Sequence, residues 1–346
     1  MSMQQFHPAA RLSRPGALAV RAAVLGLGVH VPARILTNAD LERMVDTTDE
    51  WIVTRTGIRE RHVVDADQAS SDLAVPAAQT ALREAGVEAG DLDLIICGTT
   101  TPDMVFPATA CLVQDRIGAQ RAGAFDLLAA CSSFVYGMVT ATQAIEAGIA
   151  RYVLVVGAEV LSKLVDWTDR STCVLIGDGA GAVVMGPSRN GGGVRATVVG
   201  ADGSAGDILK LPSPGSRIPM TLEAIAQQQH RARMDGQAVF KLAVRIVPEA
   251  IRQVVARAGV VLDDISLIVP HQANQRIIEA IAKATGVPLD RVVSTIDRYG
   301  NTSSASIPLS LWEARRDGRL KDGDHVVLVA FGGGFTWSAC ALTWGA

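Results

Sequence analysis

Short apolar runs rich in Val, Ile and Leu recur along the chain, each bounded by Gly, Pro, Asp or Thr. Uninterrupted runs of this kind are typical of strands buried on both faces of a sheet. The runs cover residues 22–31, 92–97, 152–156, 182–185, 265–269 and 325–330. Between them lie segments whose apolar positions have helical spacing, at residues 72–85, 134–147, 244–258, 275–284 and 307–317. Strands that alternate with helices predict the α/β class.

The order of elements in the first half of the chain returns in the second half, at an offset of roughly 170 residues. The corresponding parts are 91–96 and 264–269, Cys131 with its helix and Asn301 with its helix, and 151–156 and 325–330. Few identities accompany the repeat, and unrelated α/β stretches can also align loosely. We expect two duplicated halves, residues 21–190 and 191–346, with reactive groups where they meet.

Two segments fall outside this scheme. Residues 1–20 contain Arg11, Arg14 and an apolar piece too short for a signal-peptide core. We expect a disordered extension there, with a transit segment or a misplaced start site as the alternative. Residues 202–236 combine several prolines with a polar run of glutamines and predict a loop-rich insertion. Such a segment could cover a site or form a plain surface excursion.

Composition excludes several classes of protein. The 346 residues are 49% hydrophobic and 19% charged, and the net charge is −3 without a basic run of five, which argues against nucleic-acid binding. Five cysteines without CxxC spacing suggest neither a disulfide framework nor a zinc site, and fit a reducing, cytoplasmic location. No uninterrupted apolar stretch reaches the ~18 residues of a membrane span.

Cys131 follows the apolar residues 125–130 and precedes a helical pattern, so we expect it where a buried strand turns into a helix. The positive end of a helix lowers the pKa of a thiol from its usual value of about 8.5, which favours a nucleophilic thiolate. A small thiol that only fills space in the core is the alternative. That alternative better describes Cys97, Cys173 and Cys340.

His271 comes just after the predicted strand 265–269, at the end where open α/β sheets place their ligands. A single histidine is often structural, but Asn274 and Asn301 lie near or opposite this one in the repeat scheme. A thiol able to attack a thioester, with two hydrogen-bonding groups able to stabilise an enolate, predicts an enzyme that forms carbon–carbon bonds.

Three glycines, residues 332–334, follow a predicted buried strand. Bare backbone amides there could form an oxyanion site, in which one donor changes the rate by roughly 10²–10³. A tight turn is the alternative. The glycines at 26 and 28 and those between 177 and 181 lack the strand–turn–helix context of a dinucleotide-binding motif.

Taken together, Cys131 and the segments 271–274, 300–303 and 332–337 resemble β-ketoacyl-acyl-carrier-protein synthase III of the thiolase superfamily. The resemblance extends from about residue 22 to the C-terminus and includes residues 37–59 and 106–111. It implies a thiolase-like fold, in which two duplicated α/β halves pack as a five-layered αβαβα sandwich.

The resemblance also implies a mechanism. Cys131 would attack the thioester of a short acyl-CoA while the amides of Cys131 and Gly333 hold the oxyanion. His271 and Asn301 would then stabilise the enolate that forms as malonyl-acyl-carrier protein loses carbon dioxide, and this carbanion would attack the acyl group. The product would be a β-ketoacyl-acyl-carrier protein, the first condensation of type II fatty acid synthesis. No metal or redox cofactor is required, because the CoA thioesters are substrates.

Binding residues follow from the same resemblance. Trp51 and Arg170 would sandwich the adenine of CoA, Thr47 and Arg55 would add polar contacts, and Asn274 would face the pantetheine arm. These five positions would form the CoA-binding site.

The resemblance implies a homodimer in which Phe106 reaches the acyl pocket of the partner subunit, and Phe331 would also line an acyl pocket. Four basic residues would dock the carrier protein: Lys241, Arg245, Arg276 and Lys283. Ordinary solvated charge is the alternative for Arg245 and Lys283.

Other members of the superfamily fit less well. Elongating synthases pair the cysteine with two histidines, and degradative thiolases use a second cysteine near the C-terminus, whereas Cys340 lies in a predicted strand. A related synthase of secondary metabolism is a further alternative. A Cys-His-Asn hydrolase is a remote alternative, because hydrolases of that kind have their catalytic thiol near the N-terminus, whereas Cys131 lies far along the chain. Acetyl, propionyl and branched primers differ by a methyl or two, worth about 1–3 kcal/mol, so the sequence does not choose among them.

Overall fold

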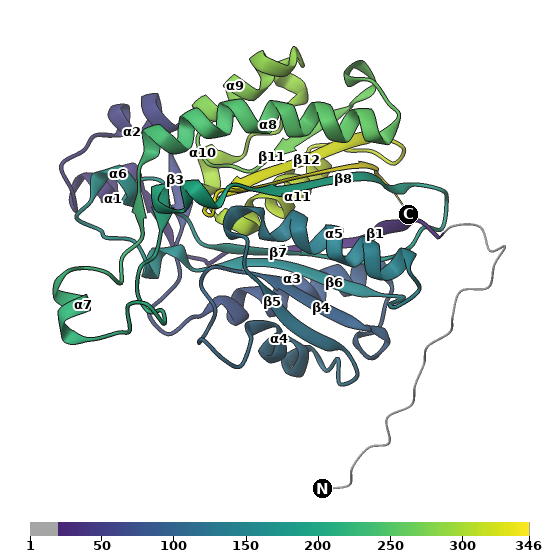
Figure 1. Cartoon of the computed structure of the whole chain (residues 1–346), viewed down its shortest axis with the longest axis horizontal. Helices are drawn as coiled ribbons and strands as arrows, with labels where there is room; N and C mark the ends of the chain where they lie inside the picture. Colours follow the sequence, from purple (N-terminus) through teal and green to yellow (C-terminus); the bar gives the residue numbers. More distant parts are fainter. Residues whose placement is uncertain (1–19, 346) are drawn as a thin grey trace, which may run out of the picture.

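Two mixed β-sheets form the centre of the protein in a computed structural model that describes residues 20–345 (Figure 1). The first sheet has the order β1 (Ala22–His30), β7 (Gly179–Pro187), β6 (Val153–Glu159), β4 (Leu94–Gly98) and β5 (Gly123–Leu127). The second has the order β8 (Gly193–Ala201), β13 (Thr336–Thr343), β12 (His325–Gly332) and β11 (Leu267–Pro270). The predicted extension, apart from residue 20, lies outside the described residues.

The two sheets share one pattern of strand directions. In the first, β1, β7 and β6 are antiparallel neighbours, and β6, β4 and β5 are parallel. In the second, β8, β13 and β12 are antiparallel neighbours, and β11 is parallel to β12. A parallel bridge from Ile268 to Val292 takes the place that β5 has in the first sheet. This agreement is consistent with duplicated halves.

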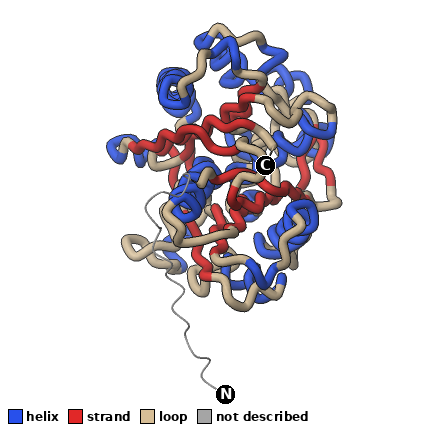
Figure 2. Tube along the Cα trace, turned by 90° about the vertical axis from the view of Figure 1, so that its right-hand side faces the viewer, coloured by secondary structure: helices blue, strands red, loops and turns tan. Residues whose placement is uncertain are grey.

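Helices cover both outer faces and fill the space between the sheets (Figures 1 and 2). On the first sheet, α3 (Ser70–Ala85) packs against β1, β7 and β6, and α4 (Thr109–Ile117) against β4 and β5. On the second, α8 (Gly236–Ala258) packs against β8, β12 and β13 and carries α9 (Gln275–Thr285). Between the sheets, α5 (Ser133–Glu146) and α11 (Ser306–Arg316) contact strands of both.

The central helices are apolar on most sides, as helices buried between two layers must be. Most of α5 is buried, and a Cβ at Gly137 would lie 2.8 Å from the Val155 side chain, so the small residue lets the helix approach β6. The apolar core between the sheets includes Phe134, Met138 and Leu328. The core therefore holds both central helices, and their N-termini, in fixed positions.

The smaller elements lie around these layers. They are β2 (Ile35–Thr37), α1 (Asn38–Glu42), α2 (Asp49–Thr56), β3 (Glu60–His62), η1 (Ala89–Asp91), η3 (Leu161–Lys163), α6 (Arg170–Cys173), η5 (Leu262–Asp264), η6 (Leu289–Arg291) and α10 (Ile296–Tyr299). The segment 202–236 holds η4 (Gly203–Ile208), β9 (Leu209–Lys210), α7 (Leu222–Ala226) and β10 (Arg233–Met234). Within residues 20–345, no helix has the length and apolar character to cross a membrane.

Each predicted strand and helix overlaps one of these elements, with shifted ends. The largest shift is at α8, which begins at Gly236 rather than at residue 244 because Asp235 caps it there with its carboxylate. One prediction is wrong: the strand before Cys131 is not buried. It is β5, which lies at the edge of the first sheet and alternates between exposed and half-buried residues.

Candidate active site

Cys131 lies in the short 3-10 helix η2 (Ala130–Ser132), between the edge strand β5 and the central helix α5. Ala130 has φ of 48°, an unusual conformation for a residue with a side chain, and it turns the backbone sharply into η2. The end of β12 presses on this turn, because a Cβ at Gly332 would lie 2.5 Å from the Cys131 nitrogen. Glycine at position 332 is therefore required for the backbones to approach.

The thiol of Cys131 is not acidified in the way the sequence predicted. Burial raises the pKa of Cys131 to about 12, although a hydrogen bond with Ser303 acts in the opposite direction, and the Glu159 carboxyl raises it further. Desolvation disfavours the thiolate more strongly than the neighbouring donors favour it. The structure therefore does not support the expected lowering of the Cys131 pKa.

His271 directly follows β11, where its backbone nitrogen donates to the Val329 carbonyl at 2.8 Å. The side chain is buried, its Nδ1 lies 2.8 Å from the Ser306 hydroxyl, and the Phe331 ring meets it edge-on at 5.4 Å between centroids. Burial lowers the pKa of His271 to about 3. The imidazole is therefore neutral near pH 7, with one ring nitrogen held by Ser306.

Asn301 lies in the turn between α10 and the 3-10 helix η7 (Ser303–Ala305). Its backbone pairs with the chain before β7, since Asn301 N donates to Leu175 O at 2.7 Å and Gly177 N donates to Asn301 O at 3.0 Å. The Ser303 nitrogen donates to Asn301 Oδ1 at 2.9 Å. Because the oxygen of the amide is engaged, its Nδ2 group remains to donate to a substrate.

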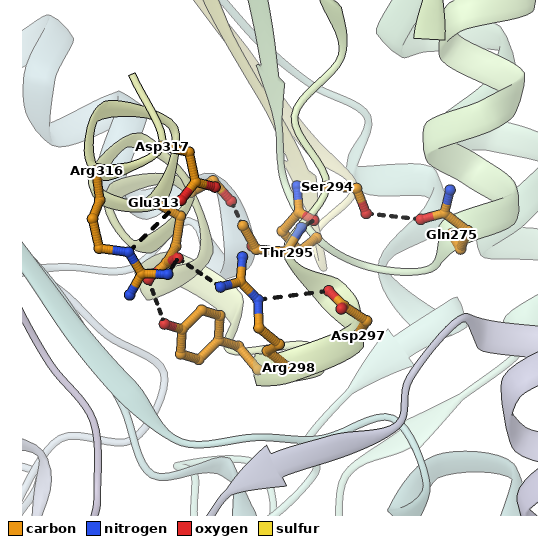
Figure 3. Close-up of polar contacts among 11 residues, drawn as sticks. Gln275, Ser294, Thr295, Asp297, Arg298, Glu313, Arg316 and Asp317 are labelled. Carbon is orange, nitrogen blue, oxygen red and sulfur yellow. Dashed lines mark hydrogen bonds and ion pairs between the residues drawn. The ribbon is translucent and has the colours of Figure 1, made fainter. Parts of the chain in front are cut away.

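The carboxylate of Glu313 anchors the segment that leads into Asn301 (Figure 3). Glu313 is a buried residue of α11 and accepts from Arg298 Nη1 at 2.7 Å and from the Tyr299 hydroxyl at 2.8 Å. Arg316 lies 2.5 Å from the same carboxylate. Since Arg298 and Tyr299 belong to α10, this network fixes α10 against α11 just before the turn that carries Asn301.

Ser303 connects the three predicted catalytic residues. Its side chain lies near Cys131 and acts to lower the pKa of that thiol, its nitrogen donates to Asn301 Oδ1, and its carbonyl accepts from Ser306, which contacts His271. Ser303 has φ of 47°, so the turn is held in a conformation that side chains rarely adopt. The sequence reasoning missed both serines, although they lie in and just after the Gly-Asn-Thr-Ser motif that it singled out.

The predicted CoA residues lie on one side of the molecule around α2. Two guanidinium groups lie over the Trp51 ring, that of Arg55 at 4.9 Å and that of Arg170 at 4.8 Å from the ring centroid. The Thr47 hydroxyl is buried without a hydrogen-bond partner among residues 20–345. Asn274 caps α9 by accepting from the Arg276 nitrogen, and its Nδ2 donates to the Arg55 carbonyl.

The other predicted site residues fall into three places. Phe106 is 83% exposed in the loop after β4, whereas Phe331 is buried beside His271. Gly333 follows β12 next to Ala130. The four basic residues are all exposed on α8 and α9, which pack together: Lys241, Arg245, Arg276 and Lys283.

The other cysteines have different surroundings. Cys97, Cys173 and Cys340 are buried in strands or the core, and burial raises the pKa of Cys340 to about 12. Cys340 lies within β13, as predicted. Among the described residues, no group of three or more His, Cys, Asp or Glu side chains could hold a metal ion.

A duplicated α/β fold with a thiol, an imidazole and an amide around one turn is the arrangement of a thiolase-like condensing enzyme, an acyltransferase. Comparisons with known proteins agree. The model for 3-oxoacyl-acyl-carrier-protein synthase III matches residues 125–203, and the model for the C-terminal part of that synthase matches residues 255–344. The chain is 55% identical over 322 residues to β-ketoacyl-acyl-carrier-protein synthase III of Symbiobacterium thermophilum, covering 93% of this chain and 98% of that one.

Solved structures lead to the same family. The β-ketoacyl-acyl-carrier-protein synthase III of Thermus thermophilus is 49% identical with a TM-score of 0.88, over 93% of this chain and 99% of that one. The priming β-ketosynthase of the R1128 polyketide biosynthetic pathway is 36% identical with a TM-score of 0.88, over 96% and 99% of the two chains. The chain belongs to the β-ketoacyl-acyl-carrier-protein synthase III family, the initiating condensing enzymes of fatty acid synthesis.

Proposed function

We propose that this protein transfers a short acyl group from CoA to Cys131 and then condenses it with malonyl-acyl-carrier protein. The observation that carries the proposal is the Ser303 turn, which joins the thiol of Cys131, the imidazole of His271 and the amide of Asn301. The family names of the relatives support the same reaction.

In the first step, the Cys131 sulfur attacks the thioester carbon and the carbon–sulfur bond to CoA breaks. The thiol proton leaves with the CoA sulfur, so charge balances. The backbone amides of Cys131 and Gly333 are our candidates for the oxyanion site, because the Gly332–Gly333 backbone packs on the Ala130–Cys131 turn. Donors held in this way stabilise the tetrahedral intermediate without reorganisation.

In the second step, the malonyl group loses carbon dioxide and its thioester becomes an enolate. Asn301 Nδ2 donates a hydrogen bond to the enolate oxygen, and the free ring nitrogen of His271 donates a second one in the tautomer that is protonated there. In that tautomer His271 Nδ1 accepts from the Ser306 hydroxyl, which then turns its hydrogen away from the Ser303 carbonyl. A neutral imidazole suits this task, because it keeps its proton while it donates. The enolate carbon then attacks acyl-Cys131, and the carbon–sulfur bond to Cys131 breaks to release the β-ketoacyl-acyl-carrier protein.

The CoA site is proposed around Trp51. An adenine ring would stack on Trp51 and be covered by Arg170, whose guanidinium now lies over the tryptophan ring and would have to move away to admit the adenine, while Arg55 borders the same tryptophan. The unpartnered hydroxyl of Thr47 supports the proposal, since a buried hydroxyl without a hydrogen bond is unfavourable unless a ligand completes it. Asn274 would contribute from the start of α9.

A homodimer is supported by the outer edge of the first sheet. Strand β5 has no partner there among the described residues, and exposed edges are sites where a second chain adds strands. Phe125 and Leu128 are 38% and 77% exposed beside it, and Val105 and Phe106 are exposed in the loop after β4. Pairing two copies at β5 would cover these side chains and carry Phe106 towards the partner's acyl pocket, next to Phe331.

The basic residues of α8 and α9 are proposed as the docking surface for the carrier protein. Lys241 and Arg245 are one helical turn apart on α8, and Arg276 and Lys283 are two turns apart on α9. The exposed positive charges would attract an acidic carrier protein and speed its arrival.

The proposal also covers the layers of the fold, the boundary between its halves and the cellular location. We interpret the helix and sheet layers as a five-layered αβαβα sandwich. The halves would meet near residue 190, between β7 and β8, with 202–236 as a loop-rich insertion in the second half. The enzyme would work in the cytoplasm. A synthase of secondary metabolism is the second candidate, favoured by the similarity to the R1128 priming ketosynthase.

The proposal is tested by incubating the protein with a panel of labelled short acyl-CoAs at equal concentration. Cys131 should gain one acyl group in the mass spectrum, and the preferred primer should be apparent from the relative rates. Cys131→Ala should gain none, whereas Cys111→Ser, a half-buried thiol outside the site, should behave like the wild type. If no short acyl-CoA labels Cys131, the synthase proposal is wrong.

A further inference from the structure

Glu159 is a buried carboxyl group that the condensation mechanism does not use. It ends β6 with no exposed surface, and it lies where loops from both halves meet. Its Oε2 accepts from the Thr100 nitrogen at 3.0 Å, the Thr100 hydroxyl at 2.8 Å and the Thr101 hydroxyl at 3.0 Å. Its Oε1 lies 3.0 Å from the hydroxyls of both Ser303 and Ser304. The carboxyl group thus fastens the loop after β4 to the turn beside Cys131.

Every hydrogen-bond partner of Glu159 in residues 20–345 is a hydroxyl or a backbone amide, and none is a cation. Glu313, the other buried glutamate, is paired with Arg298 and Arg316 instead. An ionised carboxylate that is fully buried without a cation is unfavourable by several kcal/mol. The surroundings of Glu159 therefore favour the protonated acid.

The hydrogen bonds of the Ser304 hydroxyl also favour a protonated Glu159. The Ser304 hydroxyl lies 2.9 Å from the Gly98 carbonyl and 3.0 Å from Glu159 Oε1, and it has only one hydrogen to donate. The carbonyl can only accept. If Ser304 donates to Gly98, the contact with Glu159 is a hydrogen bond only when Oε1 carries a proton and donates it to Ser304.

Charge on Glu159 would oppose the reaction of Cys131. The groups that feel Glu159 are the thiols of Cys131 and Cys97, in each of which its carboxylate raises the pKa. Asp126 and Asp103 also raise the pKa of Cys97. Asp178 precedes the β7 residue opposite Glu159, and its carboxylate accepts from Ser162 and Val64. Burial raises the pKa of Glu159 itself. A negative charge here would disfavour both a thiolate and the enolate.

We propose that Glu159 is a positioning residue that is held as a neutral carboxylic acid, clamping Thr100–Thr101 to Ser303–Ser304 without placing negative charge beside Cys131. The proposal rests on the proposed function, because it concerns the thiol that accepts the acyl group. It extends that function by naming a residue that fixes the Ser303 turn and keeps the site receptive to anionic intermediates.

Glu159→Gln tests the proposal, because an amide has the size and hydrogen-bonding pattern of a protonated acid but cannot ionise. Its oxygen can accept from the Thr100 nitrogen and its NH₂ group can donate to the serines. Alkylation of Cys131 by iodoacetamide is followed by mass spectrometry from pH 6 to pH 10. At pH 7 the alkylation rate of the variant should lie within about twofold of the wild-type rate, since no charge is removed. The variant should react faster than the wild type only at pH values at which Glu159 ionises.

An ionised Glu159 gives different results. Removing its charge would lower the Cys131 pKa by one unit or more and accelerate alkylation at pH 7 by about tenfold, which would overturn the proposal. A Glu159→Gln protein that fails to fold would also overturn it, because an amide should replace a neutral acid. The infrared difference spectrum between wild type and variant should contain the C=O band of a protonated carboxyl, and a carboxylate band instead would contradict the proposal.

Asp178→Asn is the matched control, since Asp178 is another buried carboxyl whose hydrogen bonds go to Ser162 and Val64 rather than to the Ser303 turn. Its alkylation profile should follow the wild type at every pH. These readouts need no acyl-CoA. Failure of Cys131 to be acylated would therefore count against the synthase function, whereas a carboxylate band would count only against a neutral Glu159.

Discussion

The turns η2 and η7 occupy equivalent places in the two halves and have nearly the same backbone shape. Each begins with a residue of positive φ, 48° at Ala130 and 47° at Ser303, and each leads into a central helix. The chemistry differs, because η2 carries the thiol of Cys131 and η7 follows the amide of Asn301. The two turns therefore share a backbone frame and carry different reactive groups.

Each turn is also held by a glycine from the opposite half. Gly332 at the end of β12 packs on the Cys131 nitrogen, and Gly157 in the equivalent strand β6 packs on the Ser304 carbonyl so closely that a Cβ would collide with it. The two halves are therefore interlocked at the site, and neither turn is complete without a strand of the other sheet. This reciprocal packing makes the comparison testable turn by turn.

The largest effect on the reaction is expected from removing the imidazole of His271, which belongs to the C-terminal half. His271→Ala should reduce decarboxylation of malonyl-acyl-carrier protein by roughly 10²–10³, because one donor to the enolate is lost, while acylation of Cys131 stays within a few-fold of wild type. Single-turnover acylation and release of labelled carbon dioxide measure the two steps. His325→Ala is the control, since His325 begins β12 and its side chain lies 3.2 Å from the Thr343 hydroxyl. Equal loss of both steps would show that the halves do not divide the reaction.

Substitutions at the two interlocking glycines should have effects of intermediate size, and they test whether each turn supports a different step of the reaction. Gly332→Ala and Gly157→Ala should each lower the free energy of unfolding by about 1–3 kcal/mol through overpacking. Gly332→Ala should slow acylation about 10²-fold by moving Cys131, whereas Gly157→Ala should slow decarboxylation more than acylation by moving the Ser303 turn. Urea unfolding and the two single-step assays measure this. Gly90→Ala, where a Cβ meets nothing within 4 Å, is the control.

The apolar patterns of the buried strands and central helices were sufficient to predict the α/β class, and the two sheets are consistent with the predicted repeat. The catalytic roles of Cys131, His271 and Asn301 stay predictions. Strand β5 shows why the rest was missed. Its apolar residues look buried in the sequence, but they lie at a sheet edge, and exposure there depends on which strands pair. The predicted lowering of the Cys131 pKa was wrong for a similar reason. A position at a helix end can be predicted from local sequence, whereas the burial that raises this pKa depends on the folded surroundings.

The serine and glutamate contacts could not be predicted for a related reason. Ser303, Ser306 and Glu159 have no distinctive spacing, and their roles arise only when β6 and α11 are brought together. The motif around Asn301 predicted where the turn lies, but not which hydrogen bonds the residues of the turn make.

The smallest expected effect concerns the residues that follow β4 and β11, which are Thr99 and His271. Both are buried, but only His271 titrates, with a folded pKa of about 3. Its unfolded pKa is about 6.5, so the unfolded chain binds more protons between these values and stability rises with pH across that window. Between pH 7.5 and pH 5 this residue should account for about 2 kcal/mol of lost stability. Urea unfolding at both pH values should show that loss reduced in His271→Ala and unchanged in Thr99→Ser. If His271→Ala lost as much stability between the two pH values as the wild type does, the acid sensitivity would not arise from His271 at the end of β11.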